Sequence, residues 1–209
     1  MKFVVLGTGF PDIIQTIEDI KMLDTDLDFL GFLDDNTSSN SKNLFGYDYL
    51  GSISWLEGKS DTQAFNTIAR DLSIKAKINK NLSLKGIKFI NLIHPSINTS
   101  YSEIGNEGIL ISKNAYLEAK SKISSHSIIL QGSSIGHDCY IGENTFIGPG
   151  CNILGGVKIG RNCLIGAGTT IYPGITVGDD CITGINSIIL KDIEDSETFS
   201  SNPSRKIRG

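Results

Sequence analysis

The sequence has neither an excess of positive charge nor a long apolar run. Its 209 residues include 19 lysines and arginines against 23 aspartates and glutamates, so the formal net charge is -4 at pH 7. Such a chain has no basic field that would attract nucleic acid or anionic lipid. No apolar stretch approaches the roughly 20 residues that span a bilayer. We therefore expect neither nucleic acid nor a membrane as a partner.

A secretory signal is also absent from the first residues of the sequence. The apolar stretch from Phe3 to Leu6 runs directly into Gly7-Thr8-Gly9, and it is shorter than the roughly 7 to 15 apolar residues of a signal peptide. We therefore expect a cytoplasmic protein. Hydrophobic residues make up 39% of the chain, which is enough for packed cores in one large or two small domains.

In place of these features the sequence has a six-residue repeat that runs from Ile111 to Ile189. Thirteen of the fourteen residues reached by steps of six are aliphatic, and Thr183 is the exception. A glycine often follows, and the residue four places on is usually small or β-branched. An α-helix does not have this period, and an ordinary strand alternates every two residues and then stops. A hexapeptide register of this length predicts a parallel β-helix.

Each hexad supplies one short strand and a corner, so three hexads close a triangular coil of eighteen residues. The next coil stacks on it at the sheet spacing of roughly 4.8 Å, and neighbouring coils satisfy each other's backbone groups. Almost five coils fit between Ile104 and Asp195. The seven-residue step from Ile104 to Ile111 predicts one inserted residue near Gly108.

The few cysteines and histidines are interpreted in the same register. All four cysteines fall at the small inward position, four residues after an aliphatic one: Cys139, Cys151, Cys163 and Cys181. We expect them to be buried free thiols, which behave as small hydrophobes, in a reducing compartment. His126 and His137 are eleven residues apart rather than eighteen, and His94 precedes the repeat. The three histidines therefore do not predict a zinc site.

The first ninety-odd residues alternate between strand and helix patterns, which predicts a small parallel sheet. Pro95, within His94-Pro95-Ser96, disfavours continuation of a strand ladder, so we place a Rossmann-like domain at residues 1–95 and a β-helix domain at residues 96–209. The expected strands are Lys2–Leu6, Asp28–Leu33, Thr62–Thr67 and Ile87–Ile93, and the expected helices are Asp12–Leu23 and Arg70–Asn81.

A glycine turn after the first strand of such a sheet is where phosphate meets backbone amides at a helix N-terminus. Asp34 and Asp35 end the second strand, where acids can hydrogen-bond a nucleoside. Asp12 stands where the dinucleotide fingerprint has its third glycine, so a dinucleotide cofactor is not predicted. Two interpretations stay open: a mononucleotide-type site, or a turn with two solvated acids.

His137 has the most informative position of the three histidines. It lies two residues after the inward Ile135, at a corner where side chains face outward, and Asp138 follows it. An imidazole next to a carboxylate can act as a general base. A solvated corner histidine beside an aspartate is also common, and the pair alone does not separate these interpretations.

The whole chain resembles the left-handed β-helix acyltransferases that acetylate nucleotide-linked amino sugars for bacterial surface glycans, a group that includes sialic acid O-acetyltransferases. The left hand of the helix comes only from this resemblance. The segments that carry it are Gly7-Thr8-Gly9, Phe32-Leu33-Asp34-Asp35, Ile93-His94-Pro95-Ser96, Ile135-Gly136-His137-Asp138-Cys139-Tyr140-Ile141-Gly142, Gly155-Gly156-Val157-Lys158-Ile159-Gly160 and Asn202-Pro203-Ser204-Arg205-Lys206-Ile207-Arg208.

The resemblance implies a homotrimer with acetyl-CoA bound along the coils in the clefts between adjacent solenoids, and no metal. It implies that His137 is the general base, with Asp138 making it more basic. It also implies that the Gly155 amide meets the thioester carbonyl. The coenzyme-contacting positions that it implies are Gly155, Ala167, Gly184 and Ile185, and the substrate-binding positions are Gly9, Phe10, Pro11, Asp34, Asp35 and Asn66.

Three positions depart from the pattern of the family. Phe10-Pro11 replace a Gly-His pair, Phe146 replaces a histidine nine residues after the base, and Asn66 replaces a glycine. All three concern the handling of substrate or donor rather than the base. We predict an acetyl-CoA-dependent N-acetyltransferase acting on a nucleotide-linked amino sugar, with a UDP-linked 4-amino-4,6-dideoxyhexose as the substrate. The alternatives are a sugar O-acetyltransferase and a non-catalytic β-helix scaffold.

The surface of the predicted solenoid gives an independent indication of assembly. A coil stack this short should expose flat apolar faces, for example at Leu130, Leu154 and Tyr172. Exposed apolar patches usually mark sites of association, so this pattern favours the homotrimer as well.

Overall fold

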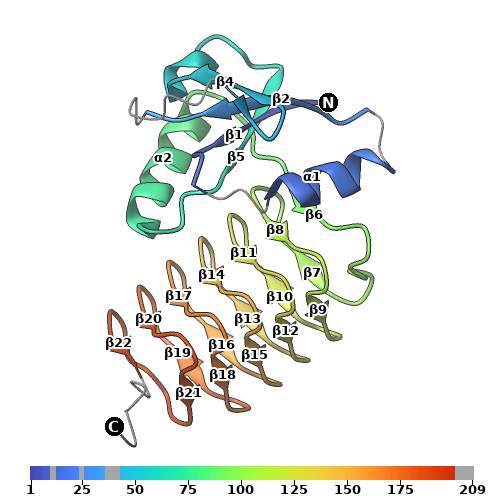
Figure 1. The fold of residues 1–209 in the computed structure, drawn as a ribbon. Helices are drawn as coiled ribbons and strands as arrows, with labels where there is room; N and C mark the ends of the chain where they lie inside the picture. Colours follow the sequence, from blue (N-terminus) through green and yellow to red (C-terminus); the bar gives the residue numbers. More distant parts are fainter. Residues whose placement is uncertain (10–12, 24–25, 36–42, 201–209) are drawn as a thin grey trace, which may run out of the picture.

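The computed structural model describes residues 1–9, 13–23, 26–35 and 43–200. It has an N-terminal α/β part that lies on one end of a long three-sided coil (Figure 1). The α/β part contains a five-stranded sheet in the order β3-β4-β2-β1-β5, parallel except for the β3–β4 pair. The strand bounds are β1 Lys2–Leu6, β2 Asp28–Leu33, β3 Asn43–Leu44, β4 Tyr47–Gly51 and β5 Thr62–Asn66.

Alternation along β1 sends its side chains to opposite faces of the sheet. Phe3 and Val5 pack on the side of helix α1 (Ile13–Lys21), and Val4 and Leu6 pack on the side of helix α2 (Leu72–Leu84). A 3₁₀ helix, η1 (Ile53–Leu56), follows β4. The Asp71 side chain caps α2 by accepting hydrogen bonds from the backbone N–H groups of Ser73 and Ile74 at 3.0 and 3.1 Å, which fixes where the helix begins.

The prediction of a strand over Ile87–Ile93 is only partly correct. Phe89 makes a single bridge to Ala64 of the N-terminal sheet, and only β6 (Leu92–Ile93) is a strand. β6 pairs with β8 of the coil. The segment passes from one sheet to the other, so no single ladder can extend over its whole length. The boundary at residue 95 stays a prediction, because β6 already belongs to a coil sheet.

The coil is a parallel β-helix of two-residue strands in three sheets (Figure 1). Partners are eighteen residues apart, as in Lys122 with Tyr140 and Tyr140 with Lys158. The strands after β6 are β7 Glu103–Ile104, β8 Leu110–Ile111, β9 Tyr116–Leu117, β10 Lys122–Ile123, β11 Ile128–Ile129, β12 Ser134–Ile135, β13 Tyr140–Ile141, β14 Phe146–Ile147, β15 Asn152–Ile153, β16 Lys158–Ile159, β17 Leu164–Ile165, β18 Thr170–Ile171, β19 Thr176–Val177, β20 Ile182–Thr183, β21 Ile188–Ile189 and β22 Thr198–Phe199.

The irregularity at the start of the coil is where the spacing predicts it. Ile104 pairs with Ile123, nineteen residues on, whereas Ile111 pairs with Ile129 at the usual eighteen. Gly108 lies in this extra turn with φ +71°, and a Cβ there would lie 2.2 Å from Nδ1 of His126. Glycine is required at this point by both the backbone conformation and the neighbouring ring.

The axis of the coil is filled by the aliphatic residue of each hexad and by the four cysteines, all free thiols that are at most 1% exposed. Burial raises the pKa of the Cys163 thiol to about 12. The predicted role of the cysteines as core residues is therefore confirmed.

The contact between the two parts corrects one prediction about the surface. Leu130 is only 4% exposed, because it packs with Leu110, Ile128 and the residues of α1 and β1. Leu154 and Tyr172, farther along the coil, are 38% and 58% exposed. Within the described part of the chain, no helix is long and apolar enough to cross a membrane.

Candidate active site

His137 lies at the corner between β12 and β13, with its side chain 64% exposed. Its Nδ1 is 2.9 Å from Oδ2 of Asp138. Its backbone N–H donates to Glu118 Oε2 at 2.9 Å, which holds the corner against the preceding coil. Asp138 has φ +57°, the left-handed conformation that turns the chain here.

The carboxylate of Asp138 is held in its ionised form. The hydrogen bond from His137 lowers the pKa of this carboxyl, and the charge of Lys120, whose Nζ is 4.0 Å from Oδ1, lowers it further. A carboxylate can only accept, so the imidazole carries its proton on Nδ1 and leaves Nε2 as an acceptor. This is the tautomer that a general base needs.

Gly155 occupies the position of His137 on the next coil, eighteen residues on. A Cβ at Gly155 would lie only 2.5 Å from His137 Nε2. Any side chain at this position would meet this ring nitrogen. Among the described residues no group accepts a hydrogen bond from the Gly155 N–H, so this donor is available on a residue that lies against the imidazole.

The predicted coenzyme-contacting residues Ala167, Gly184 and Ile185 lie at another corner. Ala167 precedes β18 and Ile185 precedes β21, whereas Gly155 follows β15. These three strands belong to one sheet, so this corner and the His137 corner flank the same face from opposite edges. One chain alone does not bring these residues together with His137.

A second candidate region lies at the carboxyl ends of β1, β2 and β5. A cavity of about 620 Å³ is lined there by the glycine turn, Asp34, Asp35, Arg70 and the start of α2. Gly7 has φ +91°, and Asp34 accepts hydrogen bonds from the Thr8 N–H at 3.1 Å and from Thr8 Oγ1 at 2.7 Å. Asp34 therefore fixes the turn, while the exposed Asp35 accepts from the Ile53 N–H at 2.8 Å.

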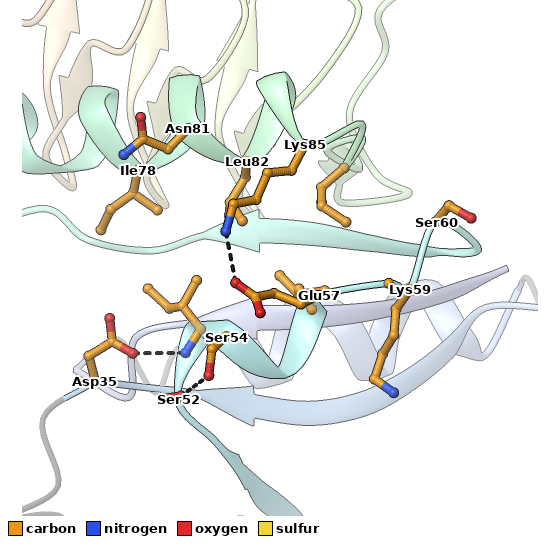
Figure 2. A pocket seen from close by; sticks show the side chains of 14 residues that line it. Asp35, Ser52, Ser54, Glu57, Lys59, Ser60, Ile78, Asn81, Leu82 and Lys85 are labelled. Atoms are coloured by element: carbon orange, nitrogen blue, oxygen red, sulfur yellow. Dashed lines mark hydrogen bonds and ion pairs between the residues drawn. The ribbon is translucent and has the colours of Figure 1, made fainter.

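A cavity of about 740 Å³ continues from this region between η1 and α2 (Figure 2). Asp35, Ile53 and Ile78 line both cavities. An ion pair at 2.9 Å joins Glu57 and Lys85 across the second cavity (Figure 2). We call these two adjoining cavities the groove; its lining extends from the glycine turn to Lys85.

The remaining predicted substrate residues differ in their placement. Gly9 lines the cavity at the glycine turn. Asn66 is 2% exposed and points inward, donating to Asn79 Oδ1 at 2.8 Å and accepting from the Ile68 N–H at 3.0 Å. It shapes the end of β5 rather than lining the groove. Phe10 and Pro11 lie outside the described residues, as does the tail from Asn202 onward.

Two features of the site were not predicted. Arg70 adds a cation to the lining of the groove. In the sequence, only its position directly before the Asp71 cap could have indicated this. Phe146 is half-buried and packs against the cluster beneath α1, so its departure from the family pattern serves the contact between the two parts. Among residues 1–9, 13–23, 26–35 and 43–200 no cluster of three or more side chains could hold a metal ion.

Comparison with protein-family models matches the solenoid. The model for bacterial transferase hexapeptide (six repeats) matches residues 120–155 and 138–173, and the model for the hexapeptide repeat of succinyl-transferase matches residues 156–191. Together these matches cover the corners that carry His137, Gly155, Ala167 and Ile185.

Solved structures resemble the whole chain. PerB from Caulobacter crescentus, in complex with CoA and GDP-perosamine, is 25% identical with a TM-score of 0.84, and the match covers 100% of this chain and 98% of that one. A mutant of perosamine N-acetyltransferase from the same organism, with the same two ligands, is 24% identical with a TM-score of 0.85 and coverages of 100% and 97%. The acetyltransferase domain of PglB from Neisseria gonorrhoeae FA1090, in complex with acetyl coenzyme A, is 23% identical with a TM-score of 0.82 and coverages of 99% and 98%.

These likenesses confirm the predicted fold, a small parallel-sheet region followed by a left-handed parallel β-helix. The repeats and the matching hexapeptide models make the chain an acyltransferase with a hexapeptide-repeat solenoid, and over its full length it resembles sugar acetyltransferases.

Proposed function

We propose that the protein transfers an acetyl group from acetyl-CoA to the amine of a nucleotide-linked amino sugar, in the cytoplasm. The observation that carries the proposal is that His137 Nε2 lies against Gly155 on the next coil, and the Gly155 N–H has no partner among the described residues. The first accepts a proton and the second donates a hydrogen bond, and acyl transfer to an amine needs both.

In the proposed step, the amine nitrogen of the sugar bonds to the carbonyl carbon of the thioester. His137 Nε2 removes the amine proton, which is worth roughly a hundred- to ten-thousandfold in rate. The Gly155 N–H donates to the oxyanion, and removing one such donor typically costs about 3 kcal/mol. The C–S bond then breaks, the proton passes from the imidazolium to the sulfur, and CoA leaves as the thiol.

A homotrimer is part of the proposal, because the residues assigned to the coenzyme and to the base flank one face from opposite edges. A neighbouring copy would bring its Ala167 edge to the His137 edge of this chain. The exposed column Leu154, Tyr172 and Leu190 runs beside the His137 corner and is 38%, 58% and 68% exposed. An apolar stripe of this kind supports contact with a second copy.

The groove of the N-terminal part is proposed to hold the nucleotide. The diphosphate would lie at the glycine turn, where the Arg70 guanidinium supplies donors for phosphate oxygens. The ribose would lie at Asp35 and the base between η1 and α2. A UDP-linked 4-amino-4,6-dideoxyhexose remains the proposed acceptor, and PerB, a similar structure, binds GDP-perosamine.

Two measurements test the function. Thermal shift with UDP-, GDP-, CMP- and dTDP-sugars should single out one nucleotide, since a ligand at a hundred times its Kd adds about 2.7 kcal/mol of stability. Release of the CoA thiol from acetyl-CoA should then depend on the matching amino sugar. If no nucleotide-linked amino sugar supports thiol release, the proposed function is wrong.

A further inference from the structure

Helix α2 has two faces with different surroundings. Ile74 and Ile78, one turn apart, line the groove proposed for the nucleotide. Lys75 and Asn79, also one turn apart, are 1% and 3% exposed. Asn79 lines a separate cavity of about 520 Å³ together with residues from the solenoid corners. The helix therefore connects the nucleotide groove to the solenoid.

Lys75 makes an unusual contact at this connection. Its Nζ donates a hydrogen bond to the backbone carbonyl of His126, on the solenoid. Within the described residues no carboxylate lies within ion-pair distance of this amine. Glu107, an acid at the same contact, approaches His126 Nε2 at 3.7 Å instead. A buried ammonium without a counter-ion is strongly disfavoured, so such a group usually loses its proton.

The same contact contains a second direct link. Asn144 Nδ2 donates to the Leu72 carbonyl of α2 at 2.8 Å and to Asn162 Oδ1 at 2.9 Å. Asn162 in turn donates to Asp180 Oδ1 at 3.0 Å. The first turns of α2 are thus attached to a ladder of side chains that runs along one corner of the solenoid. We call Lys75, His126 and Asn144 the α2 seam.

We infer that Lys75 is a positioning residue whose hydrogen bond to the His126 carbonyl holds α2 and its nucleotide groove in a fixed orientation over the solenoid. The consequence for catalysis rests on the proposed function. Acetyl transfer needs the sugar amine, which the N-terminal part carries, to reach His137 on a solenoid. The two hydrogen bonds at the α2 seam would therefore determine how close the sugar amine comes to His137.

Protonation of Lys75 should destabilise the α2 seam, because it puts an unpaired charge in a buried place. Burial lowers the pKa of Lys75 from its ordinary value near 10.5 to about 7. The other titratable groups on this contact are His126, whose pKa burial also lowers, and Glu107, Glu143, Arg161, Asp180 and Lys80 around the cavity. Lys75 is the only one of these that the structure buries almost completely, at 1% exposure.

The sign of the pH effect follows from the lowered pKa. Between about pH 7 and pH 10 the unfolded chain keeps a proton on Lys75 and the folded chain does not, so the free energy of unfolding should rise with pH over this range. Lys75→Met keeps an unbranched side chain but removes both the donor and the titration. Lys77→Met, on the exposed side of the same helix, is the matched control.

The experiment measures Tm from pH 6 to pH 10 and hydrogen exchange of α2 at pH 8 for the parent and both variants. The parent and Lys77→Met should gain stability from pH 7 to pH 10, whereas Lys75→Met should show a smaller gain. Amides of α2 should exchange about fivefold faster or more in Lys75→Met only. Parallel Tm curves with unchanged exchange would overturn the inference, whether or not the protein transfers acetyl groups.

The kinetic arm separates positioning from binding. In Lys75→Met, kcat should fall about fivefold or more while the KM values for acetyl-CoA and for the nucleotide sugar stay within about twofold. An unchanged kcat in a variant with faster α2 exchange would show that the α2 seam does not position the substrate. If the parent shows no transfer with any nucleotide amino sugar, the proposed function fails, and the stability and exchange measurements still decide the role of Lys75.

Discussion

Single residues in this chain have roles that follow from their place in the eighteen-residue coil. His137 and Gly155 occupy one position on successive coils, so the proposed base and the proposed backbone donor are neighbours although eighteen residues separate them. Asp138 then fixes which ring nitrogen of His137 holds the proton. The chemistry of the corner thus depends on the repeat that builds it.

Gly155 offers a test at this scale. In Gly155→Ala the new methyl group would lie 2.5 Å from His137 Nε2, and the exposed imidazole would have to rotate away. We expect kcat to fall about tenfold or more with little change in Tm, because the mobile ring rather than the backbone gives way. Steady-state kinetics and thermal unfolding measure the two effects. An unchanged kcat would show that the imidazole does not need its present position.

The sequence predicts some residues of the site better than others. The register of the repeat places His137 outward and the four cysteines inward, and this alone predicts their burial. Lys75 offered no such signal, because a lysine on a helix near other lysines is usually solvated. Its burial depends on where α2 meets the solenoid, which no local pattern specifies.

At the scale of elements, the groove between the glycine turn, η1 and α2 joins three segments that are far apart in the sequence. Asp35 connects them, since it lines both cavities and accepts the Ile53 N–H at the start of η1. Local patterns predicted the strands β1, β2 and β5 and the helix α2 around the groove, but not η1. The strand predicted over Ile87–Ile93 is only partly correct, because this segment leaves one sheet for another.

Asp35→Ala tests the assignment of ligands to elements. We expect the KM for the nucleotide sugar to rise about fivefold or more, because the proposed ribose contact and the anchor of η1 are both lost. The KM for acetyl-CoA should stay nearly constant, because its proposed site lies on the solenoid. Initial rates with each substrate varied in turn measure both values. Equal weakening of the two substrates would contradict the separation of their sites.

At the scale of the whole molecule, the two parts meet in an apolar contact beneath α1. Leu130 and Phe146, outward residues of the coil, pack against the cluster beneath α1. The sequence could not show which outward positions the N-terminal part covers, since the docking of two separately patterned units decides it. The exposed column farther along the coil is left for another partner.

The proposed partner for that column is two further copies of the chain. Light scattering at micromolar concentration should give about three times the mass of the 22.6 kDa chain. Tyr172→Glu, which places a charge in the exposed apolar column, should lower the mass and the transferase activity together. A monomeric mass for the parent would contradict the shared active site.

The most direct test of the account is kcat of His137→Ala as a function of pH. If His137 Nε2 removes the amine proton, kcat at pH 7 should fall roughly a hundredfold or more while acetyl-CoA still binds. The variant should recover part of its rate at high pH, where the amine loses its proton to solvent. A His137→Ala enzyme with the kcat of the parent at pH 7 would contradict the account and leave positioning as the whole of catalysis.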